Sequence, residues 1–237
     1  MKRFYIDLPL VASQIIDLPK DARQYMERVL RLKPGHAICL FNGRGGQFNA
    51  EFLGNGRVEL LEFDPIERES PLAVRLIQGI SKGDRMDVTL QKATELGAQR
   101  ISPVTTERSV VRLDEERAER RHERWSSILH SACEQCGRNR IPQLDDLHKL
   151  DHILNESQHA DEVRIVLAPT GTHTLRELPT PTHMSVLIGP EGGLSDTEIK
   201  LATERGFTAV RLGTRILRTE TAGLAILAAA QTLWGDL

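Results

Sequence analysis

The chain has 237 residues, of which 40% are hydrophobic, 27% charged and only 4% aromatic. This composition excludes a disordered chain, and the length predicts one large domain or two smaller ones. The most apolar run, 222–230, is too short for a membrane span, which needs about 20 residues. Asp7 and Pro9 interrupt the stretch where a signal peptide would be apolar, so the expected compartment is the cytoplasm.

The charge is spread unevenly along the chain. The formal net charge is −2, and arginine makes up 24 of the 31 basic residues. Residues 141–200 carry a net charge of −6, whereas the rest of the chain sums to +4. The planar arginine fork suits phosphates and base edges, so these residues are candidates for nucleic-acid contacts. Codon bias in a GC-rich genome is the alternative explanation.

The first part of the chain is predicted to consist of short elements, most of them β-strands. A strand is predicted at 4–6, a helix at 22–32, and further strands at 37–41, 47–53 and 57–63. Asn42-Gly43 and the following glycine pair are a strong turn signal. The charged, proline-bracketed segment 64–71 is the expected boundary, which predicts a small β-barrel domain over 1–70 and a second domain over 71–237.

Strands and helices alternate after this boundary. Strands are predicted at 72–80, 101–104, 163–168, 184–189 and 209–212. Helices are predicted at 85–96, 114–135, 147–155, 195–205 and 221–234. Ser195 and Glu198 form a capping box that opens one of these helices. The alternation predicts a mostly parallel α/β sheet.

Three of these strands end in unusual loops, 167–171, 187–194 and 211–222. Ligands of open α/β sheets bind outside the carboxyl ends of the strands, and glycines there let backbone amides approach a ligand. The dinucleotide-binding motif G-x-G-x-x-G does not fit the second loop, because Pro190 and Glu191 occupy its turn. The phosphate-binding Walker A motif does not fit the third loop, because no Gly-Lys pair follows there. Glu191 would repel a pyrophosphate, so a positively charged ligand fits better. Tight turns alone are the alternative explanation for the glycines.

The third loop is dense in polar residues just before an apolar helix. Arg215, Arg218 and Glu220 are candidates for a site, but helix capping by Thr219 or Thr221 is an alternative. The helix that follows carries many small residues over 222–230. An internal core is the default explanation for them, and a subunit interface is the more specific hypothesis.

Cys133 and Cys136 form a CxxC motif. A redox site would place this motif at the start of a helix after a strand, and a zinc site needs two further ligands. The pair instead lies near the end of a long predicted helix, and only His130 is close. We therefore interpret both as incidental thiols and expect no metal.

Four motifs carry a resemblance to a known family: Gln91 to Gly97 (QKATELG), Glu134 to Arg138 (EQCGR), Ile188 to Gly193 (IGPEGG) and Leu212 to Ala222 (LGTRILRTETA). Over nearly its whole length, the chain resembles the bacterial 16S ribosomal RNA uridine-N3 methyltransferases of the E type, members of the SPOUT superfamily of trefoil-knotted proteins. Cys136 departs from the pattern, since serine is expected there.

The resemblance implies a PUA-like β-barrel followed by a trefoil-knotted α/β domain with a mostly parallel sheet. It also implies a homodimer that uses S-adenosylmethionine, with the cofactor held in the knot. The cofactor-binding residues that it implies are Ala168, Pro169, Ile188, Gly189, Glu191, Gly192, Leu212, Gly213, Ile216, Leu217 and Arg218.

The implied reaction is methyl transfer from sulfur to the N3 of a uridine. Because a neutral uracil N3 carries a proton, the site must remove that proton or stabilise the anion that forms at O2 and O4. Arg218 is the candidate for stabilising the anion, and Glu220 or Glu191 for accepting the proton. All three are hypotheses from their positions in the loops.

The implied partner is 16S ribosomal RNA, on the assembled 30S subunit. The candidate RNA-binding residues are Arg3, Arg28, Arg31 and Arg44 in the barrel, with Arg108, Arg112, Arg138 and Arg140. Three other functions remain open at this point. They are a non-catalytic RNA-binding or ribosome-assembly module, a related methyltransferase with another RNA target, and a small-molecule transferase or nucleotide enzyme on an ordinary doubly wound sheet.

Overall fold

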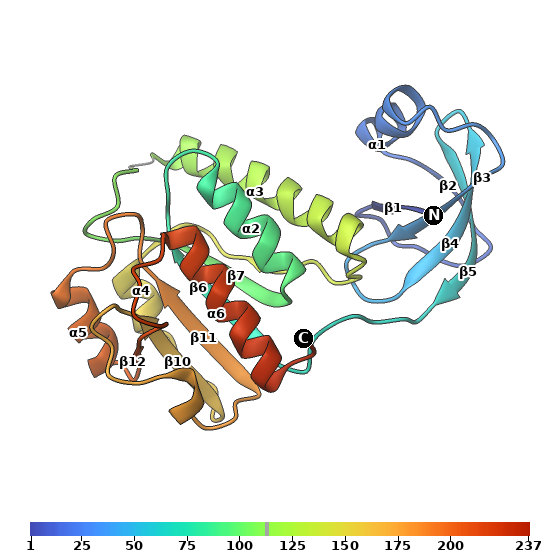
Figure 1. Ribbon diagram of the computed structural model, residues 1–237. Coiled ribbons are helices and arrows are strands. Elements are labelled where there is room, and N and C mark those ends of the chain that lie inside the picture. Colours follow the sequence, from blue (N-terminus) through green and yellow to red (C-terminus); the bar gives the residue numbers. More distant parts are fainter. Residues whose placement is uncertain (112–113) are drawn as a thin grey trace. The chain divides into compact units, whose positions relative to one another are not determined.

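The structure, a computed structural model, describes residues 1–111 and 114–237. The chain divides into two compact units (Figure 1). Unit 1 comprises 1–69 together with 130–141, and unit 2 comprises 70–129 and 142–237. The predicted division into 1–70 and 71–237 did not include the return of the chain to unit 1 at 130–141.

Unit 1 is built on a five-stranded sheet. Its strands are β1 (Lys2–Tyr5), β2 (Ile15–Asp17), β3 (His36–Phe41), β4 (Gln47–Gly54) and β5 (Arg57–Asp64), in the order β1-β3-β4-β5-β2. β1 pairs with β3 in parallel, and the other pairs are antiparallel. Alternate residues of β3, β4 and β5 enter one core, which includes Leu40, Phe52 and Leu60.

Two elements of unit 1 differ from expectation. The helix predicted at 22–32 is a short α1 (Lys20–Gln24) followed by one π-helical segment, η1 (Tyr25–Val29). It ends early because Arg31 adopts a left-handed conformation with φ of 52°. Strand β2 was not predicted, since three residues are too few for a period-two pattern to show.

Residues 130–141 belong to unit 1 through specific contacts. The Tyr5 amide donates a hydrogen bond of 2.9 Å to Glu134 Oε1, and the Tyr5 ring stacks on His130 with 4.0 Å between ring centroids. Arg3 Nη2 donates to Asn139 Oδ1 at 2.7 Å. An antiparallel bridge joins Arg44 to Arg140. These contacts depend on residues far apart in sequence, so local patterns do not reveal them.

Unit 2 contains a seven-stranded sheet in which each described strand pair is parallel. This confirms the predicted mostly parallel α/β sheet. The strand order is β12-β10-β11-β6-β7-β8, with β9 also pairing with β7. The strands are β6 (Ala73–Gly79), β7 (Ala98–Thr105), β8 (Gln143–Leu144), β9 (His148–Lys149), β10 (Glu162–Leu167), β11 (His183–Ile188) and β12 (Thr208–Val210).

Helices cover both faces of this sheet. They are α2 (Arg85–Glu95), α3 (Glu115–Cys136), α4 (Leu150–Leu154), α5 (Asp196–Glu204) and α6 (Thr219–Trp234), with a 3₁₀ turn η2 (Leu175–Glu177). α6 packs beside α2 and against β6 and β11 (Figure 1). Ile77 points to the other face, where it joins the core beneath α4 and α5. The predicted capping box at Ser195 is confirmed at the start of α5.

The order of the strands determines where the three unusual loops lie. β12, β10 and β11 are neighbours and run parallel, so the loops that follow them leave the same edge of the sheet. The polypeptide after the third loop becomes α6. The trefoil knot implied by the resemblance remains a prediction.

An ion-pair network joins β6 and β7 to the segment that follows β8. Asp145 accepts hydrogen bonds from Arg100 Nε at 2.8 Å and from Arg75 Nη2 at 3.3 Å, and Arg75 also pairs with Glu156 at 2.6 Å. Asp145 and Arg75 are both largely buried. A buried pair that loses one partner leaves an uncompensated charge in a low-dielectric environment.

We predict that Asp145→Ala destabilises unit 2 by about 3 kcal/mol, because the buried Arg75 loses one of its two carboxylate partners and keeps Glu156 and the Ser102 hydroxyl. Both tryptophans, Trp125 and Trp234, lie in unit 2, so urea unfolding followed by their fluorescence reports on this unit. The urea midpoint should fall with an unchanged slope. Lys200→Ala, which removes an exposed pair with Glu204, is the control and should leave the midpoint in place. Equal midpoints for Asp145→Ala and the control would contradict the prediction.

The CxxC thiols differ in exposure. Burial raises the pKa of Cys133 to about 12, and burial likewise raises the pKa of Cys39. Cys136 is partly exposed. We predict that Ellman's reagent at pH 8 modifies one thiol rapidly in the native protein, and that Cys136→Ser abolishes this reaction. Rapid modification of two thiols in the native protein would show that Cys133 is reactive and that the motif is not incidental.

Candidate functional site

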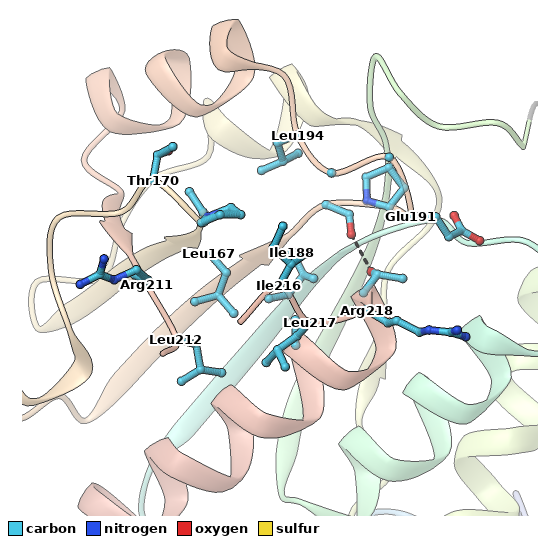
Figure 2. A pocket seen from close by; sticks show the side chains of 18 of the residues that line it. Leu167, Thr170, Ile188, Glu191, Leu194, Arg211, Leu212, Ile216, Leu217 and Arg218 are labelled. Atoms are coloured by element: carbon cyan, nitrogen blue, oxygen red, sulfur yellow. Dashed lines mark hydrogen bonds between the residues drawn. The ribbon is translucent and has the colours of Figure 1, made fainter. Parts of the chain in front are cut away.

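The three loops after β10, β11 and β12 meet in one pocket with a volume of about 720 Å³ (Figure 2). Each residue that the resemblance implied for cofactor binding lines it. These residues are Ala168, Pro169, Ile188, Gly189, Glu191, Gly192, Leu212, Gly213, Ile216, Leu217 and Arg218. Glu220 lines the same pocket, so the catalytic candidates and the cofactor candidates come together.

Backbone-to-backbone packing shapes the loops. A Cβ atom on Gly189 would lie 2.7 Å from the Gly193 carbonyl carbon and the Leu194 nitrogen. A Cβ atom on Gly171 would lie 2.5 Å from the carbonyl carbon of Val210. Real Cβ atoms do not approach backbone this closely, so only glycine fits at either position. The second loop thus folds tightly on itself, and the first packs directly on the end of β12.

Thr219 connects the second loop to the start of α6. Its hydroxyl donates to the Gly189 carbonyl oxygen at 2.6 Å, which Figure 2 marks as a dashed line, and accepts from Gln78 Nε2 at 2.9 Å. The predicted capping role of Thr219 or Thr221 is wrong. Arg218 holds the N-cap position without a side-chain cap, since an arginine side chain has no acceptor, and the Thr219 hydroxyl is committed to its two other partners.

The pocket has an apolar middle and polar sides. Leu167, Ile188 and Leu217 lie toward its centre (Figure 2). Thr170 and Arg211 lie on one side of this group, and Glu191 and Arg218 lie on the other (Figure 2). Ile216 is 86% exposed. Such a pocket suits a ligand with an apolar, flat part and a charged part.

Glu191 is held by the elements around it. Its Oε1 accepts hydrogen bonds of 2.8 Å from the Lys82 amide and from Arg85 Nη1. Partial burial would raise the pKa of Glu191, but these hydrogen bonds outweigh burial and hold the pKa below its usual value. A carboxylate stabilised in its charged form is a poor proton acceptor. We therefore assign Glu191 to bracing the loop rather than to the proton transfer expected from its position.

Glu220 has a different environment. Its Oε1 lies 3.8 Å from Arg85 Nε. Its Oε2 is buried and has no hydrogen-bond partner among the described residues. A buried carboxylate oxygen without a partner is costly, which indicates that a bound group completes its interactions. Glu220 is thus a pocket carboxylate with a buried accepting atom that has no partner in the described chain.

Arg218 is exposed at the N-terminus of α6. In the part of the chain that the structure describes, no hydrogen bond or ion pair of its guanidinium is found. This leaves a cation available to an anionic group in the pocket. Arg85, by contrast, lines the pocket but was not predicted, since nothing in its local sequence distinguishes the first residue of a helix as a pocket residue.

Five of the eight predicted RNA-binding arginines are exposed in the structure. Arg28, Arg31, Arg44 and Arg140 are exposed on unit 1. Arg108 is exposed on unit 2, but its Nη1 also donates to the Gly192 and Leu194 carbonyl oxygens at 3.2 Å, so it braces the second loop. Arg112 lies outside the described residues.

The structure argues against two of the predicted RNA contacts. Arg138 is only 4% exposed and pairs with Glu69. Arg3 lies over the Phe41 ring at 4.8 Å and bonds to Gln47 and Asn139. Both guanidinium groups have internal partners, so they hold unit 1 together rather than reach a phosphate. Sequence alone does not distinguish an internal arginine from an exposed one.

Two kinds of feature are absent from residues 1–111 and 114–237. No helix there is both long and apolar enough to span a membrane. No group of three or more histidine, cysteine or acidic side chains there is arranged to hold a metal ion.

Comparison with family models gives two matches. An RNA methyltransferase domain model matches residues 68–231, and an RNA methyltransferase PUA domain model matches residues 18–61.

Curated relatives match over the whole chain. The chain is 36% identical to the ribosomal RNA small subunit methyltransferase E of Buchnera aphidicola from Schizaphis graminum, covering 99% of this chain and 97% of that protein. It is 32% identical to the protein of the same name in Bacillus subtilis, covering 97% and 95%.

Solved structures of similar proteins resemble this chain closely over its whole length. A ribosomal RNA small subunit methyltransferase E from Neisseria gonorrhoeae, bound to S-adenosylmethionine, is 42% identical with a TM-score of 0.92, covering 100% of this chain and 99% of that one. A methyltransferase of Legionella pneumophila in complex with the same cofactor is 38% identical with a TM-score of 0.94, covering 99% and 98%.

Proposed function

The chain belongs to the ribosomal RNA small subunit methyltransferase E family, and from this premise we propose that it methylates the N3 of a uridine in 16S ribosomal RNA with S-adenosylmethionine. The observation that carries the proposal is the single pocket formed by three loops at one edge of the sheet. The full-length relatives with bound cofactor support it.

The pocket residues fit this cofactor. Leu167, Ile188 and Leu217 offer apolar surface to an adenine ring. The buried Glu220 Oε2, which has no partner in the described chain, offers negative charge near a sulfonium. Gly189, Gly192 and Gly193 line the pocket without side chains, so the second loop can meet a ligand with its backbone. A pyrophosphate would meet Glu191 and Glu220 on the same loops, which disfavours a nucleotide.

Bound S-adenosylmethionine supplies an electrophilic methyl group. The chain's own residues must prepare the uracil, because a protonated N3 has no available lone pair in the ring plane. Glu220 accepts the N3 proton through its free Oε2, while Arg218 stabilises the negative charge that spreads to O2 or O4. Glu191 keeps the second loop in place through Lys82 and Arg85.

We propose that the RNA is gripped through its phosphates by the exposed arginines of unit 1, Arg28, Arg31, Arg44 and Arg140. The chain has too few aromatic residues for an extended base-stacking surface. Recognition of RNA shape, as in the assembled 30S subunit, fits this composition.

We also propose a homodimer, with α6 at the interface. Leu233 is exposed, and Ala225 and Ala228 are partly exposed on the same helix. Small residues let two backbones approach closely. The cytoplasmic location stays a prediction.

The proposal is tested by methyl transfer from labelled S-adenosylmethionine to 30S subunits that lack the modification, with naked 16S RNA alongside. Label recovered as N3-methyluridine from the 30S subunit supports the reaction, cofactor and partner together. Label on another nucleotide would keep the methyltransferase and reject the target. Without transfer or cofactor binding, a non-catalytic RNA-binding module would replace the proposal.

We predict that Thr219→Val weakens binding of S-adenosylmethionine about tenfold, because Gly189 loses a buried hydrogen bond. Thr219→Ser keeps the hydroxyl and should retain the parental affinity. Isothermal titration calorimetry gives both dissociation constants. An unchanged constant for Thr219→Val would show that the hydroxyl does not fix the second loop.

We predict that Arg218→Ala lowers the single-turnover rate of methyl transfer about 100-fold, because the anion at O2 or O4 loses its cation. Arg218→Lys should recover part of this loss. Methylation by Arg218→Ala at the parental rate would remove Arg218 from the mechanism.

A further inference from the structure

Arg85 is the first residue of α2, and it lines the pocket with a partly exposed side chain. Its guanidinium reaches two carboxylates from different parts of the pocket. Nη1 donates to Glu191 Oε1 at 2.8 Å, and Nε lies 3.8 Å from Glu220 Oε1. One side chain from α2 therefore contacts the second loop and lies beside the first turn of α6.

The two carboxylates are not equivalent. Glu191 Oε1 receives two hydrogen bonds, one from Arg85 and one from the Lys82 amide. Glu220 faces Arg85 with Oε1 only, at a distance of an ion pair rather than a hydrogen bond. Its Oε2 stays buried without a partner among the described residues. Arg85 thus occupies one oxygen of each carboxylate and leaves one oxygen of Glu220 free.

These contacts restrict the orientation of the Glu220 carboxylate. A Glu side chain at the first turn of a helix has several rotamers, and a fixed cation on one oxygen restricts where the other oxygen points. The Thr219 hydroxyl fixes the adjacent backbone through Gly189 and Gln78. The backbone at Thr219 is therefore held by Gly189 and Gln78, and the side chain of Glu220 by Arg85, and none of these partners belongs to α6.

We propose that Arg85 is a positioning residue for methyl transfer, which orients Glu220 so that its free Oε2 accepts the proton of the uracil N3. The inference rests on the proposed function. The N3–H bond breaks and an O–H bond forms on Glu220, and the N3 electron pair forms the new N–CH₃ bond. The methyl–sulfur bond breaks with its electron pair remaining on sulfur, and the proton later leaves Glu220 for solvent.

Arg85→Gln, Glu220→Gln and Glu191→Gln are compared singly and in pairs. A misplaced proton acceptor costs about 100-fold in rate, so Arg85→Gln should lower kcat at saturating cofactor and 30S substrate by about that factor. Arg85→Lys keeps the charge and should recover part of the loss. Because Arg85 acts through Glu220, Arg85→Gln should cause no further loss in the Glu220→Gln background. It should cause its full loss in the Glu191→Gln background.

Cofactor affinity, measured by calorimetry on the same proteins, is the second readout. Arg85→Gln should change it far less than kcat. Arg124→Gln is the matched control, since it removes another arginine that pairs with an acidic residue of α2, Asp87, and should preserve kcat.

An equal loss of kcat from Arg85→Gln in the parental and Glu220→Gln backgrounds would overturn the proposal. So would a loss of cofactor affinity that accounts for the whole effect. Failure of the parental protein to form N3-methyluridine would instead overturn the proposed function, which makes the two failures distinguishable.

Discussion

The close contact between the second loop and the start of α6 is the constraint on which the site depends. The Gly189 carbonyl accepts a hydrogen bond from Thr219, and Gly189 itself has no room for a side chain. Gln78, on β6, anchors the same hydroxyl from the middle of the sheet. Three parts of unit 2 that are distant in sequence thus share one buried hydroxyl, and the pocket opens beside it.

The polar groups around this contact have separate tasks. Glu191 and Arg108 brace the second loop, one with its carboxylate on Lys82 and Arg85 and the other with its guanidinium on loop carbonyls. Arg218 and one oxygen of Glu220 remain without protein partners in the described chain. The groups that brace the loop have partners in the protein, whereas the groups proposed to meet a ligand keep unpartnered atoms.

Sequence reasoning succeeded where local rules determine the structure. The capping box at Ser195 depends on neighbouring residues, and the position of the three loops follows from strand alternation. It failed where the partner is distant. The Thr219 hydroxyl was read as a helix cap because Gln78 lies 141 positions away. The internal partners of Arg3 and Arg138 likewise come from other segments, so the local sequence does not reveal them.

The return of residues 130–141 to unit 1 has a consequence for how the protein forms. Unit 1 is discontinuous: its five strands are all made by residue 64, but the partners of Tyr5 and Arg3 include His130, Glu134 and Asn139. During synthesis, the ribosome must produce residues 70–129 of unit 2 before these partners exist. The core of unit 1, made by residues 4–60, is therefore available early, whereas its contacts with 130–141 form only after the chain has passed residue 141 and left the exit tunnel.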